Sequence, residues 1–122
     1  MEKEADDLLV NLIRDGGPSR EKALRKIYLN QAIKSKLISI IINNSGNLQD
    51  GEDMYQEAII VLDRNIREGN YRSDGSLSSY LLSIGKFLWM NHLRKKRLTL
   101  KESFLDSDLI NLDMVPDKMM MQ

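Results

Sequence analysis

The sequence predicts an all-α fold, a compact bundle of about four helices. Three observations support this. Apolar residues recur at the i, i+3/i+4 spacing of amphipathic helices in separate segments. Glycine, proline and asparagine clusters separate these segments. The best strand-like run, Ile38 to Ile42, continues a helical pattern. With 122 residues, the chain is long enough for one hydrophobic core.

The first two predicted helices meet at a glycine-proline break. Apolar residues from Leu8 to Ile13 form a short amphipathic helix, which must end at residues 16–18, Gly-Gly-Pro. A second helix is expected to start at Pro18 or Ser19 and to continue toward Ile41. The polar pair at 30–31, Asn-Gln, interrupts its apolar pattern, so a bend is expected there.

The third predicted helix begins near Asn47 or Asp50 and runs to about Arg67. One side is apolar and should face the core; it carries Tyr55, Ala58, Ile59, Leu62 and Ile66. The other side carries Asp53, Gln56, Glu57 and Arg64 around Ile60. An apolar residue surrounded by carboxylates and an amide is typical of a small protein-docking patch. A single exposed isoleucine is also ordinary on a protein surface, so both interpretations stay open.

A fourth helix should be capped by Ser76 and should carry a core stripe. The stripe consists of Leu77, Tyr80, Leu81, Ile84 and Leu88. Its opposite side mixes apolar residues with bases: Leu82, Lys86, Trp89, Met90, Leu93 and Arg97. Such a helix is either buried on two sides or contacts a partner. We expect the domain to comprise residues 1–97, and residues 98–122 to form a weakly structured acidic tail or the start of an interdomain linker.

Composition narrows the class of protein. The chain has 18 basic and 18 acidic residues, yet its charge is segregated: residues 50–63 hold five acids and no Lys or Arg, and residues 86–97 hold five bases and no acid. Two surfaces of opposite sign suggest two different partners. The absence of cysteine, of a membrane-length apolar run and of a signal peptide predicts a cytoplasmic protein without membrane contact.

An enzymatic function is not expected. The single histidine, His92, lies among bases, and no phosphate loop, dinucleotide fingerprint or nucleophile elbow is present. Asp53 and Glu57 share a helix face, but two carboxylates one turn apart are usually a solvated surface and not a metal site. We therefore expect no catalytic residue, no metal site and no cofactor.

The basic segment from Asn91 to Arg97 is a better functional candidate. Cations at a helix C-terminus favour the negative end of the helix dipole, which is one explanation. Four consecutive basic residues, 94–97, are more than an interaction with the helix dipole requires, and Trp89 and Met90 precede them. Positive charge can bind phosphates, and the adjacent Trp and Met side chains can pack on unstacked nucleobases. This combination indicates binding of single-stranded nucleic acid.

Together these segments resemble region 2 of the sigma-70 family, in its extracytoplasmic-function (ECF) group. The run Asp53-Met54-Tyr55-Gln56-Glu57 matches the family's Asp-Leu-x-Gln-Glu helix. The run from Tyr80 to Phe87 is similar to its Trp-Leu-x-x-Ile-(Ala)-x-Asn helix, and an Arg-rich end follows in both. Upstream, residues 21–28 resemble its Ala-x-x-x-Leu-Tyr helix. The resemblance covers roughly residues 5–97.

The resemblance implies a transcription initiation factor from a bacterium that binds core RNA polymerase and recognises and melts the minus-ten promoter element. It implies that the coiled coil of the polymerase β′ subunit contacts Asp53, Gln56, Glu57 and Ile60. It also implies that the loop from Tyr71 to Ser78 captures a flipped base and that the helix after it follows the non-template strand. The implied DNA-binding residues are Tyr71, Ser73, Asp74, Lys86, Trp89, Met90, Arg94, Lys95 and Arg97.

The chain departs from the family pattern at three positions. The family's Asn falls on Phe87, its Trp on Tyr80, and its later Asp on Asn91. The resemblance also implies a second helical domain that reads the upstream promoter element. No helix-turn-helix follows Arg97, so we expect the sequence to be either an isolated domain that ends in the interdomain linker or a protein that works without that second domain. The resemblance adds an anti-sigma factor as a further partner, and we expect a monomer.

The alternative, from a different class, is a helical adaptor or regulatory protein that binds another protein through the Asp53–Ile60 face without contacting DNA. The exposure of particular side chains distinguishes the DNA-binding hypothesis from the adaptor hypothesis. The DNA-binding hypothesis requires Lys86, Trp89 and Arg97 to be exposed together. Burial of Trp89 and Leu93 in the core favours the adaptor.

Overall fold

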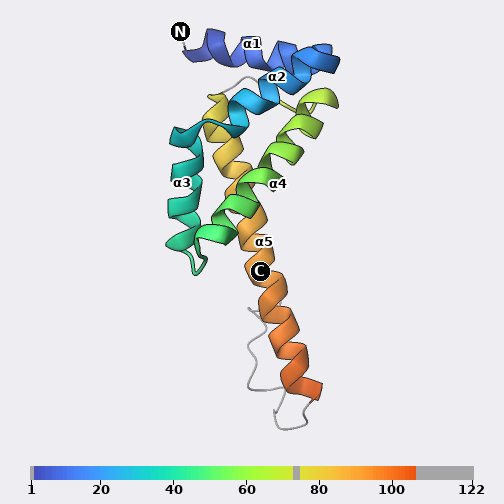
Figure 1. The fold of residues 1–122 in the computed structure, drawn as a ribbon. Coiled ribbons are helices and arrows are strands. Elements are labelled where there is room, and N and C mark those ends of the chain that lie inside the picture. The colour runs from blue at the N-terminus through green and yellow to red at the C-terminus, as the bar shows by residue number, and fades with distance from the viewer. Residues whose placement is uncertain (1, 73–74, 107–122) are drawn as a thin grey trace. The chain divides into compact units, whose positions relative to one another are not determined.

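The computed structural model describes residues 2–72 and 75–106, and it is all-helical there (Figure 1). Its elements are α1 (Glu2–Asp15), α2 (Gly17–Tyr28), α3 (Gln31–Ile42), α4 (Leu48–Arg67) and α5 (Leu77–Asp106). The chain divides into two compact units, residues 1–88 and 89–122. The all-α prediction is confirmed.

The helix breaks follow the polar and glycine residues of the sequence. Gly16 and Gly17 have φ angles of 77° and 56°, the left-handed region that glycine adopts without steric cost, and α1 ends there. The bend expected near Asn30 is a complete break. Asn30 caps α3 by accepting a hydrogen bond from the Ile33 amide at 3.1 Å, so the expected second helix is two helices, α2 and α3.

Helices α3 and α4 run antiparallel and contact each other within the first unit (Figure 1). The turn between them ends in a capping box: the Asn47 side chain accepts from the Asp50 amide at 2.8 Å, and the Asp50 carboxylate accepts from the Asn47 amide at 2.9 Å. A Cβ atom at Gly51 would lie 3.0 Å from the Ile38 Cα atom. The close approach of these two helices therefore depends on glycine at position 51.

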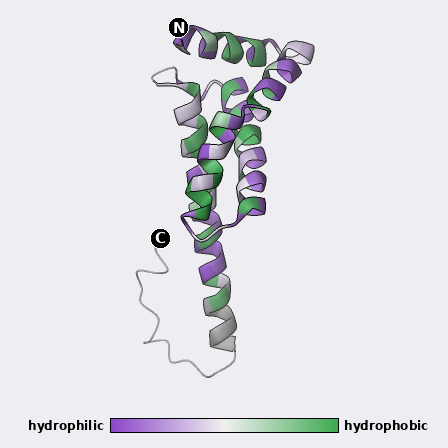
Figure 2. Ribbon diagram, turned by 60° about the vertical axis from the view of Figure 1, so that its left-hand side comes forward, coloured by the Kyte–Doolittle hydropathy of each residue, from purple (hydrophilic) through white to green (hydrophobic). Residues whose placement is uncertain are grey.

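The core of the first unit takes apolar side chains from all five helices. In Figure 2, hydrophobic and hydrophilic segments alternate along α1, as expected for an amphipathic helix. The predicted stripe of α4 is completely buried, which confirms that interpretation. On α5, Tyr80 and Leu88 are half-buried, whereas the other members of the predicted stripe are buried. The buried apolar residues of this unit include Val10, Ile13, Ala23, Ile27, Leu37, Ile41, Tyr55, Leu62, Leu77 and Leu81.

Replacing Gly51 with alanine should destabilise the protein by about 1–2 kcal/mol. The added methyl group forces α3 and α4 apart, and overpacking of this kind outweighs the helix propensity that alanine gains over glycine. Chemical denaturation measures the difference. Gly75→Ala is the control, because nothing lies within 4 Å of a Cβ atom at Gly75. Equal stability of Gly51→Ala and the natural protein would contradict this account of the helix contact.

Helix α5 continues beyond the segment expected to end it. Residues 98–106 are helical, whereas a weakly structured tail was predicted for residues 98–122. No glycine or proline occurs from Lys86 to Asp106, and leucine, lysine and arginine dominate its middle, so nothing local stops the helix. Residues 107–122 lie outside the described part. Within that part, no helix combines the length and the apolarity needed to cross a membrane.

Candidate functional site

The outer face of α4 presents the residues of the predicted docking patch. Asp53, Gln56 and Glu57 are exposed, and Ile60 is 64% exposed. The opposite face is fixed in the core, where the buried Tyr55 hydroxyl donates to the Ile27 carbonyl at 2.7 Å. Burial raises the pKa of Tyr55 to about 12. Since α4 cannot rotate without breaking this packing, Ile60 and its polar neighbours stay at the surface.

Side-chain contacts organise this face and extend it to α2. Gln49 donates to the Asp53 carboxylate at 2.9 Å, and the Gln56 amide lies 3.4 Å from the Tyr28 hydroxyl. Tyr28 is exposed beside Leu29. Tyr28 is the last residue of α2 and lies two residues before Asn30, and this position at the helix end was the signal that its ring is exposed.

Asp63 is not part of the acidic surface, although it belongs to the acidic run of the sequence. Its carboxylate is 7% exposed and receives two bonds from Arg20, from Nε at 2.8 Å and from Nη2 at 2.6 Å. Arg67 adds a contact at 3.2 Å. The hydrogen bond from Arg20, helped by Arg67, holds the pKa of Asp63 below its ordinary value. This ion pair joins α2 to α4 and is structural.

Tyr71 begins the loop that the resemblance assigns to base capture, but its ring is buried. It packs edge-on against Tyr80, with the ring centroids 4.9 Å apart, and the Tyr80 hydroxyl accepts from Asn65 at 2.9 Å. Burial raises the pKa of Tyr71, and the carboxylates of Asp6 and Asp7 raise it further. Tyr71 therefore anchors the loop on the core. Ser73 and Asp74 lie outside the described residues.

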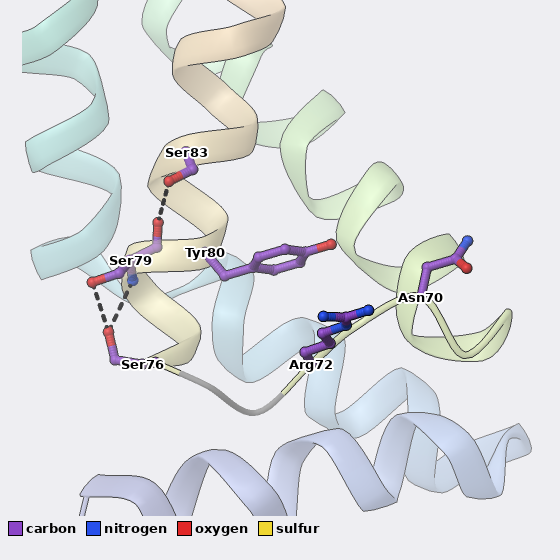
Figure 3. A pocket seen from close by; sticks show the side chains of 7 residues that line it. Asn70, Arg72, Ser76, Ser79, Tyr80 and Ser83 are labelled. Carbon is purple, nitrogen blue, oxygen red and sulfur yellow. Dashed lines mark hydrogen bonds between the residues drawn. The ribbon is translucent and has the colours of Figure 1, made fainter.

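A shallow pocket of about 340 Å³ opens where the loop meets α5 (Figure 3). The pocket is lined by Asn70, Arg72, Gly75, Ser76, Ser79, Tyr80 and Ser83. Ser76 caps the helix as predicted: its hydroxyl accepts from the Ser79 amide at 3.1 Å. The adjacent Leu77 amide donates to the Asp6 carboxylate at 2.9 Å, which ties α1 to the start of α5.

The basic part of α5 presents charge, but it does not present its tryptophan. Lys86, Lys95 and Arg97 are exposed, as is Met90. Trp89 is 3% exposed, and its ring stacks on His92 with the centroids 5.1 Å apart and the planes at 18°.

Leu93 and Arg94 are half-buried, and Arg94 donates to the Asn91 side chain at 3.0 Å. Two of the three exposure conditions for DNA binding are therefore met, by Lys86 and Arg97. Trp89 fails the third, since its ring is not available for stacking on a base in this conformation.

Among the residues that the structure describes, no group of three or more histidines and carboxylates is placed to hold a metal ion. On the described residues, the outer face of α4 presents Ile60 among polar side chains, and residues 77–101 contain no Asp or Glu.

Residues 29–99 match the family model described as Sigma-70 region 2, which is more than half of the chain. The matched span includes α3, α4 and α5 as far as Thr99, and therefore both surfaces except Tyr28. The comparisons with curated proteins and with solved structures found no match.

Proposed function

Because the chain belongs to the sigma-70 region 2 family, we propose that it acts in transcription initiation by binding core RNA polymerase and promoter DNA through separate helices. The outer face of α4 is the polymerase-binding surface, and α5 with its preceding loop is the DNA-binding surface. The observation that carries the proposal is the exposure of Ile60 on the same helix face as Gln56 and Glu57, one turn after the motif that carries the resemblance.

The polymerase contact is proposed for the coiled coil of the β′ subunit. Asp53, Gln56 and Glu57 supply charge and hydrogen-bonding groups, and Ile60 supplies the apolar centre of the contact. A small apolar centre with a polar rim is the usual anatomy of a protein interface. The exposed Tyr28 lies beside Gln56 and enlarges the apolar part.

The DNA contact is proposed to hold the melted minus-ten element. Lys86, Lys95 and Arg97 would neutralise phosphates of the non-template strand, and the loop would receive an unpaired base. No covalent chemistry is involved. Phosphate neutralisation and base contacts offset the unstacking cost of about a few kcal/mol, so that binding favours the open duplex.

A salt series tests the DNA contact. We expect the complex of this protein with core polymerase to retain a promoter bubble with an affinity that falls steeply with salt, because phosphate contacts release counterions. Lys86→Ala should weaken retention and reduce the slope of log affinity against log salt by about 1. Electrophoretic retention measures both quantities. Lys22→Ala, a matched removal of an exposed lysine on α2, should leave the slope unchanged.

A helical adaptor that binds protein through α4 alone is the second candidate. The burial of Trp89 favours it, because an aromatic ring expected to stack on DNA is instead enclosed, whereas Leu93, whose burial would also favour the adaptor, is half-buried. A pull-down with purified core polymerase separates the two. An adaptor of other proteins would capture no polymerase, and a salt-insensitive or absent DNA contact would remove the promoter-binding part of the proposal.

A further inference from the structure

Asp6 of α1 caps the first turn of α5, although the residues it joins are 71 positions apart in the sequence. Its carboxylate accepts from the Leu77 amide at 2.9 Å. Residues 77–80 contain no acid, so Asp6 supplies from another helix the negative charge that favours the positive dipole end of α5. Together with the Ser76 hydroxyl, which accepts from the Ser79 amide, it satisfies two of the amides that a helix leaves unpaired at its start.

The position of Asp6 is fixed by the packing of α1 within the first unit. Asp6, Val10 and Ile13 lie at i, i+4 and i+7, which is one helix face. Val10 and Ile13 are buried, and α1 contacts both α2 and α4. Helix α1 crosses the end of this unit at which α5 begins (Figure 1). Asp6 therefore reaches α5 from a helix that the core holds in place.

The segment that Asp6 caps carries one wall of the pocket. That wall consists of three serines on the first turns of α5, Ser76, Ser79 and Ser83 (Figure 3). On the other side of the loop, the buried Tyr71 has its pKa raised by burial and, further, by the carboxylates of Asp6 and Asp7. The acids of α1 therefore act on both ends of the loop that borders the pocket.

A direct contact between Asp6 and DNA is disfavoured. A carboxylate repels phosphates, and this one is half-buried and already bonded to a backbone amide. Its contribution to DNA binding is therefore geometric: it keeps the start of α5 in helical form and close to α1.

We propose that Asp6 is a positioning residue for promoter DNA, which holds the first turn of α5 so that the pocket keeps the shape that receives the melted strand. The inference rests on the proposed function, which places that strand on α5 and its preceding loop. Helix α1 lies outside residues 29–99, the span that matches the family model. The proposal therefore assigns a role in DNA binding to a helix that the family match does not include.

The test uses the full chain bound to core polymerase, and it measures the affinities for polymerase and for a fluorescent promoter bubble separately. We expect Asp6→Ala to weaken bubble binding by about 2- to 10-fold, because the first turn of α5 loses its cap and binding must restore it. Polymerase binding and the salt slope should not change, since the outer face of α4 and the phosphate contacts are intact. Asp6→Asn should retain most of the affinity, because its amide oxygen also accepts from a backbone amide. Glu4→Ala, which removes an exposed carboxylate from the same helix, is the control.

Weakened bubble binding in Asp6→Ala, with Asp6→Asn and Glu4→Ala close to the natural protein, supports the inference. Unchanged or tighter bubble binding in Asp6→Ala overturns it; a tighter complex would mean that Asp6 occupies an amide that a DNA phosphate would otherwise use. Equal weakening in Asp6→Asn, or loss of polymerase binding together with bubble binding, overturns it as well, because the hydrogen bond to Leu77 would then not be a specific cause.

The natural protein distinguishes failure of this inference from failure of the proposed function. If it binds polymerase and bubble DNA while the Asp6 variants overturn the inference, the proposed function stands. If it binds neither, the proposed function fails and the inference fails with it.

Discussion

Glu57→Arg should abolish co-purification of the protein with core RNA polymerase. Glu57 is exposed next to Ile60 on the outer face of α4. Reversing a charge at the rim of an interface replaces attraction with repulsion, and like-charge juxtaposition costs several kcal/mol. An interface held by a small patch does not tolerate that loss, because each 1.4 kcal/mol lowers affinity about tenfold. Asp53→Arg should have the same effect.

The measurement is a pull-down with purified core enzyme, accompanied by circular dichroism. Helicity should remain intact, since the substituted side chains face solvent and arginine is a good helix former. Glu21→Arg is the matched control: it makes the same charge change at an exposed position of α2 and should not affect binding. Retention of polymerase by both α4 variants would show that the docking surface is elsewhere.

The sequence predicted the helices well where local signals determine them. The Gly16-Gly17 break, the Asn47 cap and the Ser76 cap depend on residues within a few positions, and the structure has all three. The orientation of α4 about its own axis was also predictable, because its apolar stripe from Tyr55 to Ile66 faces the core and leaves the opposite face exposed to solvent. The exposure of Ile60 follows from that periodicity.

Contacts between distant parts of the chain were not predictable. Arg20 and Asp63 are 43 residues apart, so charge counting assigned Asp63 to an acidic surface that it does not join. A related problem arises on α5, because the spacing of its apolar residues allows either side of the helix to be buried. Trp89 is buried and Phe87 is exposed, and the mixed apolar and basic pattern of that helix does not distinguish them.

Asp63→Asn should lower the free energy of unfolding by about 1–3 kcal/mol at pH 7. The carboxylate is nearly buried, and replacing it weakens the charge-assisted bonds from Arg20 and Arg67. The lower half of this range is expected, because the Arg20 side chain is 34% exposed and water screens its charge. Urea denaturation at neutral pH measures the difference. Asp53→Asn, at an exposed position of α4, should change stability far less.

The pH dependence of the same variant identifies the ion pair as the cause. The folded protein holds the pKa of Asp63 below the ordinary carboxyl value of 3.8. The stabilisation is therefore complete above that value and is lost as the pH falls through the lower folded value. The stability difference between the natural protein and Asp63→Asn should shrink over that acidic window, since a protonated carboxyl and an amide are both neutral. A difference that stays constant with pH would mean that shape, and not charge, makes Asp63 necessary between α2 and α4.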